Sequence, residues 1–253
     1  MSSSAGRLRL ITDAVRASGQ RTVAELVELT GASDMTIRRD LELLAGQGVL
    51  ERYRGGARSL LLRGEEPPFA LRSQDGLETK RRLAAEVAEL LADGESVVLD
   101  SGSTCLEVAR AITHRRLTVM PLSLHAANAL TGAAQLKLLL PGGEPRPGEL
   151  ALTGPLAEAS LGALRFDTAV IGCCGLNAAN GLTAYDLADA AIKRAAINAA
   201  RRVVAVTEAA KFSRTALAHV TPISALHVVV TGQDAPEDEV QALTAAGVAV
   251  RRV

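Results

Sequence analysis

The sequence predicts an α/β fold in two parts, a small N-terminal domain and a larger domain built on a mainly parallel sheet. Short amphipathic helices and a hairpin fill residues 1–59, whereas apolar strand-like runs alternate with helices over residues 80–253. Between them, residues 60–79 hold Pro67-Pro68, two glycines and several charges, a composition typical of a linker. The predicted organisation is therefore domain, linker, domain.

The composition is that of an ordinary globular chain, with 48% hydrophobic and 22% charged residues among 253. No apolar run suits a membrane span, and the N-terminus has no apolar segment behind a basic start, so a secretion signal is not expected. The three cysteines, Cys105, Cys173 and Cys174, are odd in number and include no C-x-x-C pair. We therefore expect a cytoplasmic protein with no membrane partner, disulfide framework or cysteine zinc site.

The first sixty residues have the pattern of a winged helix-turn-helix. Apolar spacing predicts a helix over 7–17, and the S/T-x-x-E capping box at 22–25 predicts a second helix that Gly31 ends. Ser33-Asp34 can cap a third helix, and residues 49–57 form a hairpin that turns at two glycines. The third helix has one apolar face, made of Ile37, Leu41 and Leu44. Three short helices followed by a basic hairpin are typical of DNA-binding domains.

In that fold the third helix would enter a major groove, and the hairpin arginines would contact phosphates or the minor groove. An arginine on the helix can bind guanine through two hydrogen bonds or neutralise a phosphate, and the sequence leaves both open. Alternatively, the arginine pair is only the solvated side of a helical bundle; the agreement of turn, helix and basic hairpin favours DNA. The residues expected at the DNA are Ser33, Met35, Thr36, Arg38, Arg39, Arg52, Arg54 and Arg58.

The stretch SDMTIRRDLELLAGQGVLERYRGGA, residues 33–57, resembles the DNA-binding domain of DeoR-type bacterial transcriptional regulators. The usual pattern of that family runs S-x-x-T-I-R-R-D-L, a leucine-rich half-turn, G-x-L, and a basic R-x-x-G-G-A wing. The resemblance implies a repressor-like protein that binds operator DNA.

The larger region alternates strands and helices, which implies a sheet covered on both faces. The predicted strands are 96–99, 117–120, 136–140, 168–171, 203–206, 226–230 and 248–250, and the predicted helices are 83–91, 104–112, 122–130 and 187–200. Glycine-rich segments follow three strands, at 101–103, 141–143 and 172–175. Ligands bind at the carboxyl ends of such strands, so these loops are expected to share one pocket. None matches a dinucleotide or ATP motif, and no cofactor is expected.

The segment 100–104 joins a strand to a helix. Thr104-Cys105-Leu106-Glu107 is a second S/T-x-x-E box, which predicts that the helix begins at Thr104. The N–H groups of its first turn and the nearby hydroxyls suit an anion, and a thiol at Cys105 could have a lowered pKa there. Alternatively the segment is a capped helix without a ligand, and the segment by itself favours that interpretation.

The larger region also resembles the effector domain of DeoR-type regulators, which is similar to ribose-5-phosphate isomerase. The D-S-G-T-T loop of the family looks like 100–104, its L-P-G-G loop like 140–143, and its G-L-T like 181–183. The resemblance implies a phosphorylated sugar as effector. The implied effector residues are Asp100, Ser101, Gly102, Ser103, Thr104, Gly142, Gly143, Gly172, Gly175, Asp186, Lys193 and Lys211. Two departures concern the effector's identity: residues 120–123 read Met-Pro-Leu-Ser where the family commonly has T-N-S, and Glu208 stands where aspartate is usual.

Several of these residues have plainer interpretations. Asp189 and Lys193 could be an ordinary surface pair at i and i+4, and Lys211 a solvated loop lysine. Cys173 and Cys174 are expected to be small packing residues near the pocket. The four histidines show no metal spacing, so no metal site is expected.

Two functions remain in competition. The first is a repressor whose operator affinity changes with a sugar phosphate; it is not an enzyme, and palindromic operators would require at least a dimer. The second is a sugar-phosphate isomerase or hydrolase with an accessory DNA-binding domain. Its general base would have to be Asp100, Asp186 or Asp189, and no catalytic constellation is recognisable in the sequence.

Overall fold

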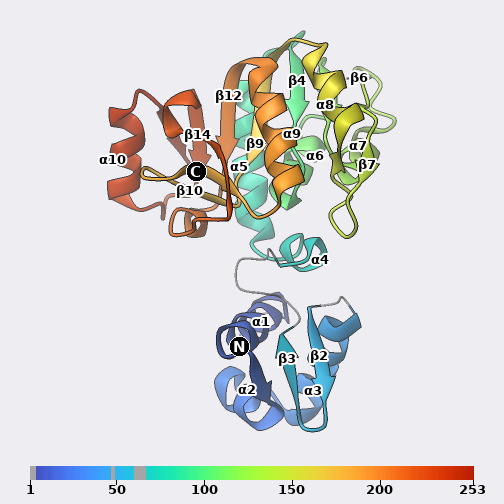
Figure 1. Ribbon diagram of the computed structural model, residues 1–253, viewed down its shortest axis with the longest axis vertical. Helices are drawn as coiled ribbons and strands as arrows, with labels where there is room; N and C mark the ends of the chain where they lie inside the picture. Colours follow the sequence, from blue (N-terminus) through green and yellow to red (C-terminus); the bar gives the residue numbers. More distant parts are fainter. Residues whose placement is uncertain (1–3, 47–48, 60–66) are drawn as a thin grey trace. The chain divides into compact units, whose positions relative to one another are not determined.

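The computed structural model describes residues 4–46, 49–59 and 67–253, and its chain divides into two compact units, Met1–Gly76 and Leu77–Val253 (Figure 1). Each unit has a hydrophobic core of its own. None of the helices in these ranges is long and apolar enough to cross a bilayer.

Unit 1 is a winged helix-turn-helix with one additional short helix. Its elements are α1 Ser4–Ser18, β1 Gln20–Thr22, α2 Val23–Thr30, α3 Asp34–Gly46, β2 Leu50–Tyr53, β3 Gly56–Ser59 and α4 Phe69–Arg72. The three strands form an antiparallel sheet in the order β1-β3-β2, and β1 is a strand that the sequence did not predict. The predicted capping box of α2 is confirmed: the Thr22 hydroxyl accepts from the Glu25 N–H, and the Glu25 carboxylate accepts from the Thr22 N–H.

The I-R-R-D-L segment of α3 alternates between core and surface. Ile37 and Leu41 are fully buried in the core of unit 1. The Asp40 carboxylate is also buried and accepts hydrogen bonds from Arg7 of α1, at 2.6 Å from Nε and 3.3 Å from Nη2. These contacts fix the rotation of α3 about its axis, and they leave the two arginines between them on the outer face.

Within the predicted linker, the structure describes α4 and the start of the next helix. Leu71 of α4 packs against the core of unit 1, and Asp75 accepts a hydrogen bond from Arg9 of α1 at 3.1 Å. The segment from 67 to Gly76 therefore belongs to unit 1, and residues 60–66 lie outside the described ranges.

Unit 2 contains a seven-stranded sheet in which every neighbouring pair is parallel, in the order β15-β14-β12-β9-β4-β5-β6. Its strands are β4 Ser96–Leu99, β5 Thr118–Pro121, β6 Lys137–Leu138, β9 Phe166–Gly172, β12 Ala200–Val206, β14 Val228–Thr231 and β15 Ala249–Arg252. Its helices are α5 Leu77–Leu90, α6 Ser103–Ala111, α7 Leu124–Leu130, α8 Pro155–Gly162, α9 Leu187–Asn198 and α10 Glu237–Ala245, with two 3-10 turns, η1 Ala209–Lys211 and η2 Ile223–Ala225. Antiparallel pairs complete it: β7 Glu144–Pro145 with β8 Leu152–Thr153, and a small sheet of β10 Gly175–Asn177, β11 Gly181–Ala184 and β13 Ala218–Thr221.

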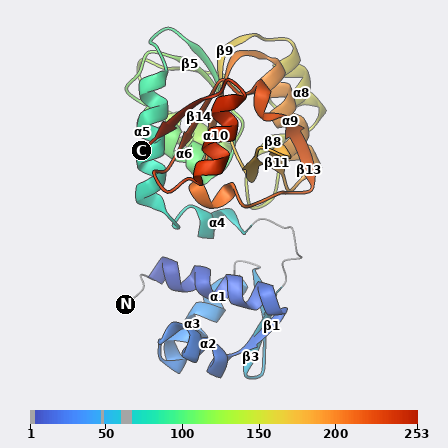
Figure 2. The same ribbon diagram turned by 90° about the vertical axis from the view of Figure 1, so that its left-hand side faces the viewer.

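The helices cover both faces of the large sheet, as the continuous apolar runs of the strands predict. Side chains of α5, α6 and α7 form one core with Val97 and Leu99, whereas α8, α9 and α10 form the other with Val98. Figures 1 and 2 show α5 and α6 on one side of the sheet and α8 and α9 on the other. The sequence did not predict α8 or α10, and it extended the helix at 187–200 into what is the first residue of β12.

The strand order contains one switch point, between β4 and β9. From β4 the chain proceeds outward to β5 and β6, and from β9 it proceeds outward on the other side to β12, β14 and β15. At such a point the connections leave in opposite directions and open a crevice at the carboxyl edge of the sheet. Asp100 follows β4, and Gly172 ends β9, so two of the predicted site residues lie at this crevice.

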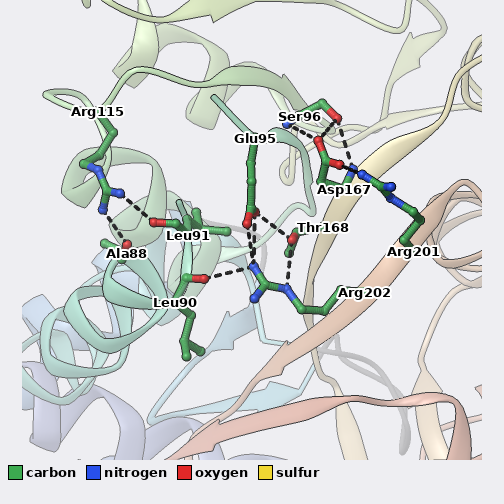
Figure 3. A network of polar contacts seen from close by, with 10 residues as sticks. All are labelled: Ala88, Leu90, Leu91, Glu95, Ser96, Arg115, Asp167, Thr168, Arg201 and Arg202. Atoms are coloured by element: carbon green, nitrogen blue, oxygen red, sulfur yellow. Dashed lines mark hydrogen bonds and ion pairs between the residues drawn. The ribbon is translucent and has the colours of Figure 1, made fainter. Parts of the chain in front are cut away.

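At the opposite edge, arginines hold the carboxyl end of α5 (Figure 3). Arg202 donates to the Leu90 carbonyl at 2.9 Å, to Glu95 at 3.1 Å and to Thr168 at 3.0 Å. Arg115 donates to the carbonyls of Ala88 and Leu91. Cations satisfy the last carbonyls of a helix and favour its dipole, so α5 is fixed to the amino ends of β4, β9 and β12.

Replacing Arg202 by alanine should lower the free energy of unfolding by about 1–3 kcal/mol, because Glu95 loses its counter-charge and the Leu90 carbonyl its donor. Urea denaturation of the full chain measures the change. Arg201→Ala is the matched control: the Arg201 side chain is 81% exposed in its pair with Asp167, and its loss should cost less than about 0.5 kcal/mol. Equal losses for the two variants would contradict the anchoring role of Arg202.

Candidate functional site

Asp100 joins the two strands of the switch point. It is fully buried, and its N–H donates to the Val170 carbonyl of β9 at 2.9 Å. Its Oδ2 accepts from the Gly172 N–H at 2.9 Å and from the Lys193 ammonium of α9 at 2.5 Å. Its Oδ1 is also buried and accepts no hydrogen bond from the described residues. A buried carboxylate oxygen with a vacant lone pair is suited to accept a hydrogen bond from a ligand hydroxyl.

Lys193 is the centre of a buried charge cluster. Its ammonium also lies 3.2 Å from Asp189 Oδ1, and both of these side chains are at most 5% exposed. The interpretation of this pair as an exposed surface contact is therefore wrong, because α9 turns that face toward the sheet. Burial by itself lowers the pKa of Lys193, but the charges of Asp100 and Asp189 outweigh it and hold the pKa well above its usual value. Lys193 is a cation at neutral pH.

The helix after β4 begins differently from the prediction. α6 starts at Ser103, its N-cap is Gly102 with φ +99°, and no side chain caps it. The predicted capping box is wrong, because Glu107 is buried and pairs with Arg110 and with Arg81 Nε of α5, 3.6 Å away. The first turn of α6 therefore presents backbone donors that no side chain of its own satisfies, beside the buried hydroxyl of Ser103 and the half-buried Thr104.

The glycines of the other loops stand where backbones approach closely. A Cβ at Gly172 would lie 3.3 Å from the Ser101 carbonyl and 3.5 Å from Asp100 Oδ2, inside the crevice. A Cβ at Gly175 would lie 2.3 Å from the Arg214 carbonyl, and one at Gly143 would lie 2.4 Å from the Thr153 carbonyl. Packing alone therefore explains glycine at the last two positions. Gly142 lies in the same loop as Gly143 and is exposed.

The remaining predicted residues surround the charge cluster. Asp186 caps α9 by accepting from the Asp189 N–H at 2.9 Å, and its other oxygen lies 3.8 Å from Arg146 Nη1. Lys211 ends η1 and is half-buried. Its charge lowers the pKa of the Cys173 thiol against the larger effect of burial. Asp186 thus lies at the start of α9, and Lys211 lies in the connection that follows β12.

The cysteines are packing residues of this edge. Burial raises the pKa of the Cys173 thiol to about 12, and burial together with the charge of Asp100 raises the pKa of Cys105. The expectation that the helix terminus lowers the pKa of Cys105 is therefore wrong. Cys174 is buried in the core on the α9 side.

Sequence reasoning did not include one charged residue of this edge, Lys80, among the effector residues. Lys80 of α5 is 3% exposed, and its ammonium lies 3.4 Å from Glu208, which precedes η1. In the sequence Lys80 stands among charged residues at the end of the predicted linker, and nothing local marks it as buried. Only the packing of α5 against the sheet reveals it.

The predicted DNA contacts lie on two elements of unit 1. Met35, Arg38 and Arg39 are exposed on α3, and Thr36 is half-buried, with its N–H bonded to the Ser33 hydroxyl that caps the helix. The arginines of the hairpin and its turn, Arg52, Arg54 and Arg58, are also exposed, whereas Leu50 and Ala57 of the hairpin are buried in the core. In this unit Arg38 pairs with Asp34, Arg52 with Glu42 and Arg58 with Glu51, whereas Arg39 and Arg54 form no ion pair with the described residues.

Comparison with known proteins identifies the family. The DeoR-like helix-turn-helix domain matches residues 7–61, and the DeoR C terminal sensor domain matches residues 76–233. The chain belongs to the DeoR family. It is 32% identical over 235 residues to the glycerol-3-phosphate regulon repressor of Escherichia coli (strain K12), and the aligned region covers 92% of this chain and 93% of that protein. It is 31% identical over 247 residues to the HTH-type transcriptional regulator GlpR of Haloferax volcanii, and the aligned region covers 97% of this chain and 96% of that protein.

Among solved structures, ribose 5-phosphate isomerase A from Methanocaldococcus jannaschii matches 55% of this chain and 55% of its own, with 16% identity and a TM-score of 0.41. That score is too low to carry an argument about function. The assignment of this DeoR-family chain to a doubly wound α/β fold rests on its own strand order.

Replacing Lys193 by methionine should lower the free energy of unfolding by about 3–5 kcal/mol near pH 8, because Asp100 and Asp189 stay buried without their cation. In the wild type the raised pKa of Lys193 keeps its contribution complete below the unfolded value of about 10.4, and the contribution is lost only as the pH rises through the folded pKa.

In the Lys193→Met variant, the two buried carboxylates determine how the free energy of unfolding changes with pH. An uncompensated buried carboxyl has a folded pKa above its unfolded value, so the protein should recover stability as the pH falls toward about 5. Urea denaturation at both pH values tests this, with the exposed Lys137→Met as control. A loss of stability that is the same at both pH values would contradict the buried charge cluster.

Proposed function

We propose that this chain is a DNA-binding transcriptional repressor of sugar or related carbon metabolism genes, and that a phosphorylated sugar bound in unit 2 changes its operator affinity. The observation that carries the proposal is that Oδ1 of buried Asp100 has no hydrogen-bond partner among the described residues, next to a helix terminus without a side-chain cap. The names of its relatives support the same class of effector, since one of them is a glycerol-3-phosphate regulon repressor.

Each part of such an effector has a matching group. The phosphate would lie at the first turn of α6, where backbone N–H groups, the Ser103 and Thr104 hydroxyls and the helix dipole favour an anion. A hydroxyl of the sugar would donate to Asp100 Oδ1, while Lys193 and the Gly172 N–H hold Oδ2. Lys211, which the family resemblance assigns to the effector, would supply a further cation for the phosphate.

The charge cluster favours binding over catalysis. Aldose–ketose isomerisation needs a base that removes a proton from carbon, and a base must be unprotonated and free to move. Lys193 is held as an ammonium by two carboxylates. Asp100 accepts two hydrogen bonds at Oδ2, and Asp186 is engaged as a helix cap. We therefore propose that unit 2 senses its ligand and is not an enzyme; turnover of a sugar phosphate by the purified chain would contradict this.

Unit 1 supplies the operator contacts. α3 would lie in the major groove with Met35, Arg38 and Arg39 toward the bases and backbone, and the hairpin would contact the flanking phosphates. A palindromic or repeated operator requires at least a dimer of this chain. A protein that binds operator DNA works where that DNA lies, which supports the proposal of a cytoplasmic location.

Thr104→Val should weaken the effector response at least about tenfold in effector concentration while operator affinity without effector stays unchanged, because one hydroxyl donor to the phosphate is lost. Fluorescence anisotropy on DNA from upstream of the chain's own coding sequence, titrated with a panel of sugar phosphates, measures both quantities. Thr113→Val, beyond the other end of α6, is the matched control and should respond as the wild type. An unaltered dose–response curve for Thr104→Val would count against the phosphate position.

A further inference from the structure

Asp34 and Arg38 form a two-point ion pair on the outer face of α3. Arg38 Nε lies 2.5 Å from Asp34 Oδ1, and Nη2 lies 3.3 Å from Oδ2. The carboxylate therefore meets the side of the guanidinium that carries Nε. Asp34 is the first residue of α3 and Arg38 follows one turn later, so the pair lies at the amino-terminal half of the helix.

This geometry leaves one edge of the guanidinium available. The group has five N–H donors in a rigid fork, and the side-on carboxylate takes one from Nε and one from Nη2. The end-on pair, one N–H from each Nη, remains. That pair matches the O6 and N7 acceptors of guanine in the major groove.

The negative charge of Asp34 makes Arg38 more suited to bind a guanine base than a DNA phosphate. A phosphate that approaches Arg38 meets the carboxylate and is repelled by it, whereas the major-groove edge of guanine is uncharged and is not. Arg39, the next residue, is equally exposed and has no carboxylate partner among the described residues. The two neighbouring arginines are therefore placed for different tasks, Arg38 for a base and Arg39 for a phosphate.

The helix that carries the pair is held firmly. Ile37 is fully buried beside Arg38, and Asp40 is bound to Arg7 of α1. With the helix fixed and its side chain paired, Arg38 loses less rotamer freedom when it binds than an unpaired arginine would.

We propose that Asp34 is a specificity-determining residue, which holds the Arg38 guanidinium side-on so that its end-on fork reads a guanine in each operator half-site. This inference rests on the proposed DNA-binding function. Asp34 acts through Arg38 and is a positioning residue. An exposed pair of this kind contributes little to folding stability, so its removal should leave the fold intact.

The test begins with the full-length wild type and DNA from upstream of its own coding sequence. Footprinting locates the protected half-site, and anisotropy then measures affinity for duplexes in which each base pair is replaced in turn. In the wild type one G·C pair should stand out, with a loss of about 5- to 150-fold on replacement. In Asp34→Asn the loss at that pair should fall below about threefold, and binding to unrelated DNA should tighten because a negative charge is gone.

Four further variants separate positioning from general effects. Arg38→Ala should abolish discrimination at the same base pair, and Asp34→Asn should add nothing to it in the double variant. Arg39→Ala should weaken all sequences alike and reduce the salt slope by about 1. Asp13→Asn is the matched control: Asp13 forms an exposed i, i+4 pair with Arg9 on α1, and its variant should discriminate as the wild type does.

Other results would overturn the inference. If Asp34→Asn weakens every duplex equally, Asp34 supports the helix and not base recognition. If the wild type binds its operator but no G·C pair depends on Arg38, then Arg38 contacts phosphate and only this inference fails. If the wild type binds none of its upstream DNA more tightly than unrelated DNA, the proposed function fails, and the inference fails with it.

Discussion

The buried contact between Asp100 and Lys193 is the interaction on which the organisation of unit 2 depends. Through one carboxylate, β4 is bonded to β9, and α9 is attached to both. The residues lie 93 positions apart in the chain, so only the tertiary fold brings them together. A buried ion pair of this kind adds little net stability compared with apolar packing, but it penalises every arrangement that separates its members. It therefore defines where the loops of the carboxyl edge must lie.

The elements of the fold could be predicted from the sequence wherever a local pattern leads to the same structure in any surroundings. The capping box at Thr22 formed as predicted because Glu25 is exposed and free to turn back onto its own helix. The same pattern at Thr104 failed because Glu107 faces α5, where Arg81 attracts it, and Gly102 takes the N-cap position. Local chemistry is identical in the two segments. Tertiary surroundings decide between them, and a single sequence does not contain those surroundings in readable form.

The candidate site was predictable in its location and not in its contacts. Loops after parallel strands lie at one edge of a sheet, so the sequence predicts that Asp100 and Gly172 share an edge; the strand order of the structure, with β4 beside β9, makes them neighbours. The burial of Lys193 and Lys80 was not predictable, because lysines in charged helices are usually solvated. The ion pair of Asp34 with Arg38 differs from these lysines, because the i, i+4 spacing on a helix is enough to predict it. Its proposed role in base recognition depends on the side-on geometry, which only the structure gives.

The two filled cores of unit 2 also limit how such a protein can evolve. Along β4 the side chains of Val97, Val98 and Leu99 alternate between the two cores, and each is fully buried, so a change at any of them disturbs packing on one face. The connections at the carboxyl edge include exposed residues such as Gly142, which lie outside both cores. In another connection, residues 120–123, where the resemblance would place T-N-S, Leu122 is directed into the core. Substitutions at exposed connection residues can therefore change the carboxyl edge of the sheet while both cores stay packed.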